Sequence, residues 1–378
     1  MDKQQIYIAN QSLEKLPETL EQFRAKRIFL VTGKKSFSLS GAEQRIKSLV
    51  AGWQIHHFSD FSVNPKLEDI QKGIQEFKEF SPEIVLVIGG GSPIDIAKTI
   101  NILAFHNADP REYILKERDL ERPGLPLIAV PTTAGTGSEA THFAVAYIDG
   151  VKYSLAHPAM LPDVALIDPS LTLNLPRYIS ASTGADALSQ AIESYWSVQA
   201  TQESKAWAKK AIMLAIKNLK KTVLNPDVEA RTAMMQAAHL AGRAIDISKT
   251  TACHALSYPF TIHFKIPHGH AVVLTLSSIL SYNSQVKDDD CADQRGPVYV
   301  RETMNELFQM LGAKSGEAAA KILHELFQEI GLELRLSKLG ITQKDIELIL
   351  SEASLERMKN NPRLLNTENT REILSSIL

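Results

Sequence analysis

The fold class follows from one stretch of the sequence, Glu83-Ile84-Val85-Leu86-Val87-Ile88-Gly89-Gly90-Gly91-Ser92-Pro93. A continuous apolar run of this length is typical of a strand buried on both faces of a parallel sheet. The glycines end the strand, and Ser92-Pro93 opens a helix. Glycines let the backbone approach a diphosphate, and a helix N-terminus adds N–H donors and the positive end of a dipole. The stretch predicts either a nucleotide-binding turn, in which Asp95 orients the turn or reaches the cofactor, or a ligand-free strand-to-helix turn.

Short β-rich runs and helical stretches alternate on either side of this turn. Further strands are predicted at 27–31, 53–58, 127–130 and 164–167. Between 53–58 and 83–88, Asn64 is predicted to cap a helix that has Pro65 at its first position. Asp149-Gly150 is a strong hairpin signal between the runs 143–148 and 151–155. After about residue 179 the pattern is helical. We predict an α/β doubly wound, Rossmann-like domain over residues 1–176 and an all-α domain over residues 177–378.

Composition narrows the class of protein. The 378 residues are 44% hydrophobic, which is enough for two cores, and 41 basic against 43 acidic residues give a formal net charge of −2. That balance argues against a general nucleic-acid or membrane-surface binder. No apolar run approaches the roughly 20 residues that span a bilayer. Two cysteines form no disulfide framework, and the first residues lack a secretory pattern, so we expect a cytoplasmic protein.

The end of the first strand bears on cofactor choice. NAD sites of the Rossmann type usually place an acid there for the ribose, whereas NADP sites avoid that charge and supply cations. Here the strand is followed by Gly33, Lys34 and Lys35. The absence of an acid favours NADP over NAD, with Gly33 and Lys34 as cofactor-binding residues. The alternative is that the two lysines are solvated loop charges.

A candidate metal site is distributed along the second half of the chain. Asp186, Gln190 and Glu193 have helical spacing and share one helix face. His254 and His268 lie far along the chain, and one carboxylate with two imidazoles can hold a first-row divalent metal. With 11 histidines in the chain, packed or surface histidines are the alternative interpretation.

The motifs together resemble the iron-containing (group III) alcohol dehydrogenases. The matching segments are Gly89-Gly90-Gly91-Ser92-x-x-Asp95-x-Ala97-Lys98, Pro131 to Glu139, Thr183-Gly184-x-Asp186-Ala187-Leu188, His254 with Pro267-His268-Gly269, and Asn361-Pro362-Arg363. The resemblance implies a metal-dependent, NAD(P)-linked alcohol dehydrogenase or aldehyde reductase that works where a nucleotide-binding and a helical domain meet. It also implies a homodimer or larger homo-oligomer. By position it assigns cofactor contacts to Gly89, Gly90, Gly91, Ser92, Asp95, Thr132, Thr133 and Lys152, and ligands of Fe²⁺ or Zn²⁺ to Asp186, His254 and His268.

Two positions depart from the family pattern. Gln190 stands where the family usually has a fourth ligand, a histidine. This leaves open a three-residue site with water, a Gln-ligated site, a shifted metal preference or a lost metal, and we favour a metal retained on three ligands. Tyr258 stands where many members have a second histidine, and it is either a proton or hydrogen-bond donor to the substrate or a packed aromatic residue.

The segment 249–259, together with His268-Gly269-His270, resembles the subgroup that reduces phosphonoacetaldehyde. A phosphonate needs a local cation and hydroxyl donors, for which this resemblance suggests Lys249, Thr250, Thr251 and His270. The alternative is a surface lysine followed by helix-capping threonines. The proton for the alkoxide would come through Tyr258, His270 or water.

Two other functions are compatible with these motifs. One is an NAD- and metal-dependent cyclase of the dehydroquinate synthase type, which shares the fold without net redox change. The other is a metal-free binding protein, for which Gln190 is the only indication. The segments Pro131 to Glu139 and Pro267-His268-Gly269 favour the dehydrogenase. We expect a small-molecule aldehyde or alcohol as the partner, and neither nucleic acid nor membrane.

Overall fold

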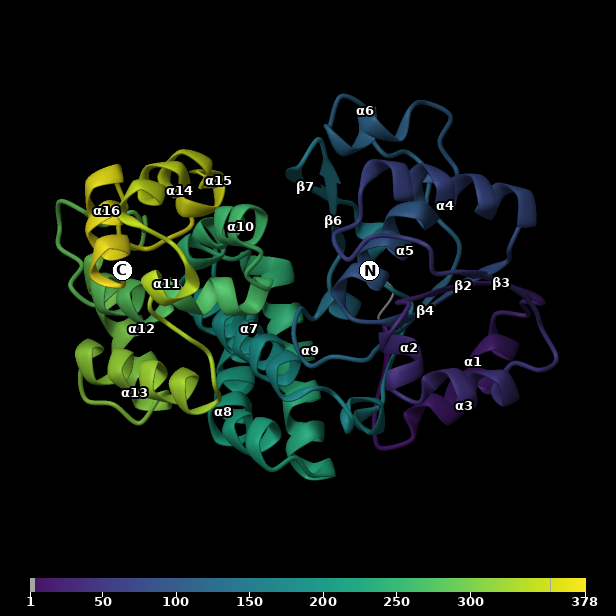
Figure 1. Ribbon diagram of the computed structural model, residues 1–378, viewed down its shortest axis with the longest axis horizontal. Coiled ribbons are helices and arrows are strands. Elements are labelled where there is room, and N and C mark those ends of the chain that lie inside the picture. Colours follow the sequence, from purple (N-terminus) through teal and green to yellow (C-terminus); the bar gives the residue numbers. More distant parts are fainter. Residues whose placement is uncertain (1–3, 354) are drawn as a thin grey trace. The chain divides into compact units, whose positions relative to one another are not determined.

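The computed structural model describes residues 4–353 and 355–378 (Figure 1). Its contacts divide the chain into two units, Met1–Leu175 and Pro176–Leu378. This division lies one residue from the boundary proposed from the change in sequence character after Leu175-Pro176.

The N-terminal unit is built on a six-stranded parallel sheet with the strand order β1-β8-β5-β4-β2-β3. Its strands are β1 (Gln5–Ile8), β2 (Arg27–Thr32), β3 (Gln54–Phe58), β4 (Ile84–Gly89), β5 (Leu127–Pro131) and β8 (Val164–Ile167). Its α-helices are α1 (Leu16–Gln22), α2 (Ser36–Leu39), α3 (Ala42–Leu49), α4 (Leu67–Phe80), α5 (Gly91–Leu103) and α6 (Pro110–Ile114). The chain order reverses between β2 and β4, and ligands of such sheets bind outside the carboxyl ends of the strands at this switch point.

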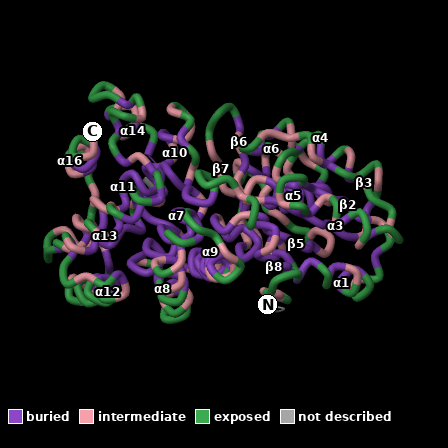
Figure 2. Tube along the Cα trace, turned by 60° about the horizontal axis from the view of Figure 1, so that its bottom comes forward, coloured by how far each residue is buried: buried purple, intermediate pink, exposed green. Residues whose placement is uncertain are grey.

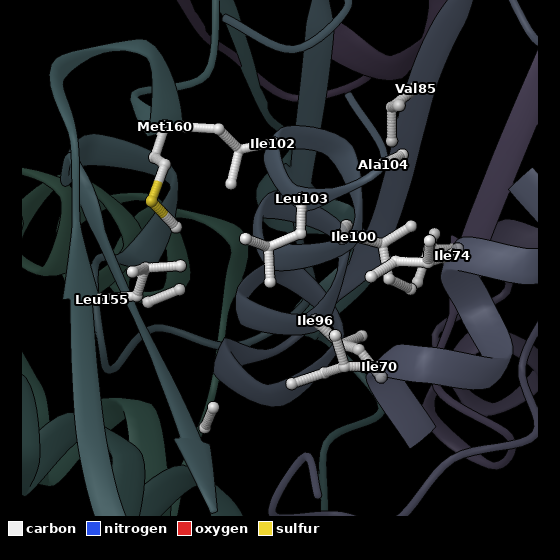
Figure 3. Close-up of a cluster of buried hydrophobic side chains, with 14 of the residues drawn as sticks. Ile70, Ile74, Val85, Ile96, Ile100, Ile102, Leu103, Ala104, Leu155 and Met160 are labelled. Carbon is white, nitrogen blue, oxygen red and sulfur yellow. The ribbon is translucent and has the colours of Figure 1, made fainter. Parts of the chain in front are cut away.

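Alternate residues of β4 enter two different cores. Val85 and Val87 pack with residues of α4 and α5, whereas Ile84, Leu86 and Ile88 pack with residues of α1 and α3. Figure 2 shows the central strands as buried. In the close-up of Figure 3, α5 places Ile96 and Ile100 beside α4, and other side chains of α5 point toward Leu155 and Met160. Helices therefore cover both faces of the sheet, and the predicted doubly wound fold is confirmed.

The predicted hairpin is also present, as β6 (Phe143–Ile148) and β7 (Val151–Ala156), paired antiparallel. Asp149 and Gly150 both have positive φ, 53° and 80°, as a two-residue type I′ turn requires.

Two local predictions were incomplete or wrong. Strand β1 was not predicted, because it is a short edge strand without a fully buried residue. The expected start of α4 was wrong. Lys66, rather than Asn64, is the N-cap, and the Asp69 side chain completes a capping box. Pro65 stays outside the helix because its carbonyl accepts the backbone N–H of Tyr147 at 2.8 Å.

The C-terminal unit is helical, as predicted, and its described residues contain no strand. Its α-helices are α7 (Arg177–Trp196), α8 (Gln202–Leu224), α9 (Val228–Ser248), α10 (Ala252–Phe264), α11 (His268–Asn283), α12 (Pro297–Met310), α13 (Gly316–Glu329), α14 (Ile346–Glu352), α15 (Leu355–Met358) and α16 (Thr367–Ser376). Helix α7 packs against α8, α9 and α11, and α10 packs against α11. No helix among the described residues is both long and apolar enough to cross a bilayer.

Candidate metal centre and cofactor turn

Three helices of the C-terminal unit bring the predicted metal ligands together. Asp186 lies on α7, His254 near the start of α10, and His268 is the first residue of α11. Their ligand atoms all lie within 4.8 Å of one another. Asp186 Oδ1 is 3.3 Å from His254 Nε2 and 4.0 Å from His268 Nε2. Because metal–ligand bonds to nitrogen and oxygen are about 2.0–2.2 Å long, one cation can reach all three atoms after small side-chain adjustments.

A glycine allows this convergence. A Cβ at Gly269 would lie 2.0 Å from the carbonyl oxygen of Ser182 and 2.8 Å from Cβ of Asp186. The backbone N–H of His270 donates to Ser182 Oγ at 3.1 Å. Only glycine at 269 lets the first turn of α11 lie against α7, and this contact sets the position of His268 relative to Asp186.

Glu193 holds one of the ligands in place. Its Oε1 accepts hydrogen bonds from Thr251 Oγ1 (2.8 Å), Cys253 N (2.8 Å), Thr251 N (3.2 Å) and His254 N (3.3 Å). Its Oε2 bonds to His254 Nδ1. This bond assigns the proton to Nδ1 and turns the Nε2 lone pair toward Asp186, the arrangement of a carboxylate–histidine–metal triad. Spacing placed Glu193 on the same helix face as Asp186, but it did not predict this role.

The electrostatics of the buried pair favour positive charge. Burial alone would lower the pKa of His254, but the carboxylates of Glu193 and Asp186 outweigh it and raise that pKa. Burial alone would raise the pKa of Glu193, but His254 and the hydrogen bonds lower it. The site therefore stabilises a cation, as a metal centre must.

The donor set fits a divalent metal. Gln190 Oε1 and His254 Nε2 are buried and have no hydrogen-bond partner in the described part of the chain. Gln190 Nε2 donates to Asp186 Oδ2 at 3.2 Å. Two acceptor atoms 3.3 Å apart, His254 Nε2 and Asp186 Oδ1, repel each other unless a cation or proton lies between them. Gln190 is placed either to supply a fourth ligand or to orient the carboxylate.

In the N-terminal unit, the triple glycine lies at the switch point of the sheet. Strand β4 ends at Gly89, and α5 begins at Gly91 with Gly90 as its N-cap. A Cβ at Gly89 would lie 2.5 Å from Cγ of Pro93, and one at Gly33 would lie 3.4 Å from the same atom. The carboxyl ends of β2 and β4 therefore meet at the first turn of α5, which is the anion-binding end of a helix.

The loop after β5 lies beside this turn. Thr132 N donates to the Gly89 carbonyl at 2.9 Å. A Cβ at Gly90 would lie 3.1 Å from Thr133 Oγ1, and one at Gly91 would lie 2.8 Å from Cγ2 of Thr136. Thr132 Oγ1 is buried and has no hydrogen-bond partner among the described residues. Ser92, in the first turn of α5, is partly exposed. The predicted cofactor-binding glycines and threonines are thus neighbours.

Asp95 links the turn to the hairpin. It accepts from Ser138 Oγ at 2.5 Å and from Val145 N at 3.1 Å. Burial raises the pKa of Asp95, against the lowering effect of Lys98 and Lys152. Lys98 is fully buried, and its ammonium donates to the Thr141 and Phe143 carbonyls at 2.8 and 3.1 Å. Of the two predicted roles of Asp95, these bonds correspond to orienting the turn.

Lys34 has an acidic partner that lies far from it in the sequence. Its ammonium lies 2.6 Å from Asp60 Oδ1, and Lys72 lies 2.6 Å from Asp60 Oδ2. The two ammonium groups lower the pKa of Asp60 to about 2. The loop after β3 thus provides a carboxylate partner for Lys34, and the three exposed side chains keep one net positive charge.

His270 is held by bonds to its neighbours. Its Nδ1 bonds to the Tyr178 hydroxyl at 2.9 Å and its Nε2 to the Glu333 carbonyl at 2.6 Å. Burial lowers the pKa of His270, so the ring is neutral, accepting from Tyr178 and donating to Glu333. A direct proton transfer from His270 to a substrate would break one of these bonds.

Lys249 and Tyr258 lie near a third residue, Arg357, that the sequence did not single out. Cζ of Arg357 lies 5.8 Å from the ring centroid of Tyr258, and its Nη1 donates to Thr250 Oγ1. Arg357 also contributes to lowering the pKa of Lys249, chiefly a consequence of burial. In contrast, the hydroxyl of Thr251 is buried against Glu193 and Trp196. The predicted phosphonate contacts are therefore divided: Lys249 and Thr250 lie together, whereas Thr251 and His270 bond to other partners.

The chain is similar to known proteins over nearly its whole length. A model of the iron-containing alcohol dehydrogenase family matches residues 3–169, and a model of the C-terminal domain of the Fe-containing alcohol dehydrogenase family matches residues 180–378. The chain is 32% identical to long-chain-alcohol dehydrogenase 1 of Geobacillus thermodenitrificans, over 90% of this chain and 86% of that protein. It is 33% identical to phosphonoacetaldehyde reductase of Streptomyces viridochromogenes, over 79% and 77%.

A solved structure covers the whole chain. The crystal structure of sulfoacetaldehyde reductase from Bifidobacterium kashiwanohense in complex with NAD⁺ is 30% identical, with a TM-score of 0.90 over 100% of this chain and 97% of that one. These matches confirm the predicted resemblance and the oxidoreductase class, and they do not favour a cyclase. The chain belongs to the iron-containing alcohol dehydrogenase family.

Proposed function

We propose that this protein, an oxidoreductase of CH–OH groups like its relatives, interconverts a small aldehyde and its primary alcohol with a divalent metal and a nicotinamide cofactor. The observation that carries the proposal is the convergence of Asp186, His254 and His268 beside Gly269. A bound divalent ion supplies Lewis acidity at a carbonyl oxygen, and a bound nicotinamide supplies the hydride.

The residues of the metal site have distinct roles in this proposal. Asp186, His254 and His268 bind the ion, and the carboxylate offsets part of its charge. Glu193 holds a proton at His254 Nδ1, so that Nε2 is the ring nitrogen left to bind the ion. Gln190 completes the site or orients Asp186. Two imidazoles with oxygen donors suit Fe²⁺ or Zn²⁺.

The cofactor site is proposed at the triple glycine. Backbone N–H groups of Gly90, Gly91 and Ser92 bind the diphosphate at the start of α5. Thr132, Thr133 and Lys152 contribute further contacts, and Asp95 acts through Ser138.

For the cofactor itself we favour NADP over NAD. Gly33 carries no charge toward the ribose, and Lys34 and Lys72 outnumber Asp60. The ratio of kcat/KM for NADPH and NADH, measured also in Lys34→Gln, tests this preference. A higher kcat/KM with NADH than with NADPH in the wild-type protein would contradict it.

The substrate is proposed to be a small aldehyde with an acidic group. Two relatives are named for such aldehydes, phosphonoacetaldehyde and sulfoacetaldehyde. Lys249 and Thr250 provide a cation and a hydroxyl next to α10, and Tyr258 is proposed to donate the proton or hydrogen bond to the substrate oxygen. Mutation of Tyr258 to Phe should then lower kcat and leave metal content unchanged.

A single assay decides the main proposal. Metal-stripped protein is reloaded with Fe²⁺ or Zn²⁺ and incubated with NADPH or NADH and a panel of aldehydes, and steady oxidation of the cofactor is followed. Turnover that depends on the metal is expected, and His268→Ala should nearly abolish it while cofactor binding survives. Unchanged turnover in metal-stripped protein would refute the role of the metal. A cyclase would show no net cofactor oxidation. The homo-oligomeric state and the cytoplasmic location stay predictions.

A further inference from the structure

We infer that Arg357 and Lys249 form an anion-binding subsite that takes the phosphonate or sulfonate group of the aldehyde substrate. This inference rests on the proposed reductase function and deepens it, because it assigns the residues that select an acidic substrate.

Arg357 presents an unneutralised guanidinium to this subsite. Its contacts within the described part of the chain are Thr250 Oγ1 and the face of the Tyr258 ring, and neither is a carboxylate. A guanidinium has five N–H donors in a planar fork that matches the oxygens of phosphonate or sulfonate. Thr250 is fixed in turn, since Asn360 Nδ2 donates to its carbonyl at 3.2 Å.

Lys249 has a backbone conformation that is typical of glycine. Its φ is 60° and its ψ is 173°, a region that other residues occupy only under strain. Glycine would adopt this conformation without strain, so a lysine here indicates a use for its side chain. Such strained residues cluster at ligand clamps.

The charges around Lys249 favour an anion. Its ammonium donates to the Asp246 carbonyl at 3.2 Å and is partly buried. Burial lowers the pKa of Lys249, the Asp246 carboxylate raises it, and Arg357 lowers it by a smaller amount. Lys249, Arg357 and Asp246 together keep one net positive charge, which an acid group between the two cations would balance.

Lys249 and Arg357 are connected to the metal site by hydrogen bonds and by neighbouring positions in the sequence. Thr250, which bonds to Arg357, precedes Thr251, which bonds to Glu193 behind His254. Tyr258, under the guanidinium, follows His254 by four positions on α10, roughly 6 Å along the helix. A short substrate whose carbonyl oxygen lies at the metal would place its acid group at about this distance from the metal.

The test compares acidic and neutral aldehydes in the metal-loaded protein. The substrates are phosphonoacetaldehyde, sulfoacetaldehyde and butanal, and the variants are Arg357→Gln and Lys249→Gly. Losing one hydrogen-bonded charge should lower the kcat/KM ratio of acidic aldehyde to butanal by roughly 10- to 100-fold, mainly through KM. Lys249→Gly should also raise the melting temperature, because it relieves strain. Lys359→Gln, an exposed charge two residues after Arg357, is the matched control and should leave the ratio unchanged.

The outcomes separate this subsite from the reductase function. Wild-type protein that reduces butanal as well as both acidic aldehydes, or a ratio that neither variant changes, would overturn the subsite and leave the reductase intact. If no aldehyde is reduced, calorimetry with 2-hydroxyethylphosphonate and isethionate still decides. Binding that Arg357→Gln weakens supports the subsite, and absent or unaltered binding overturns it. A preference between the two acids identifies which one the subsite takes.

Discussion

Glu193 provides the sharpest test of the metal site, because it touches a ligand without being one. In Glu193→Gln the amide oxygen can keep the four bonds that Oε1 accepts from residues 251–254. The amide NH₂ then faces His254 Nδ1 in place of Oε2 and donates to it. The ring proton has to move to Nε2, the atom that faces Asp186, and a protonated nitrogen cannot bind a metal.

The expected loss can be estimated from this geometry. Partners that orient a metal-binding histidine are typically worth about 10- to 100-fold in metal affinity, which corresponds to about 1.4 to 2.7 kcal/mol. Because the shape and most hydrogen bonds of the side chain are retained, the fold should survive. Glu193→Ala would instead leave several buried donors unsatisfied, at a cost of about 1–3 kcal/mol each. This variant is expected to disrupt the packing between the helices.

The assay is a competitive titration of metal-stripped protein with Zn²⁺ or Fe²⁺ against a chelator, with melting temperature measured in parallel. Glu372→Gln, an exposed carboxylate on α16, is the matched control and should bind metal like the wild type. A Glu193→Gln protein that is folded and binds metal with unchanged affinity would refute the reasoning, since the tautomer of His254 would then not depend on Glu193.

Three further predictions concern other parts of the chain. Gln190→His should increase Zn²⁺ affinity in the same titration, because imidazole is a better ligand than a carboxamide; unchanged affinity would place residue 190 outside the coordination sphere. Gly91→Ala should weaken NADPH binding by on the order of tenfold, about 1.4 kcal/mol, because its Cβ would lie 2.8 Å from Thr136; fluorescence titration measures this, and metal content serves as the control. His57, bonded to Thr32 at 2.7 Å, has a pKa lowered chiefly by burial from its ordinary 6.5, so the folded state resists protonation and stability should fall as pH drops below that value. Urea midpoints between about pH 7 and pH 5 should fall less in His57→Gln, and equal declines would contradict this.

Much of the fold could be predicted because its signals are local. A few residues are enough to predict the structure of the apolar run of β4, of the glycines after it and of the Asp149-Gly150 turn. Local signals also failed where tertiary contacts override them. Pro65 has the right position for a helix start, but its carbonyl bonds to the backbone N–H of Tyr147 and it lies outside the helix.

The chain by itself determined the order of strands and helices and the residue types of the metal site, since periodicity and chemical identity are written in sequence. Only the folded structure decided which side chains meet. His270, next to a ligand in sequence, bonds to Tyr178 and Glu333, whereas Arg357 reaches Thr250 across 107 residues. Side-chain direction depends on how helices pack, and that packing is a sum of many distant contacts that no short motif contains.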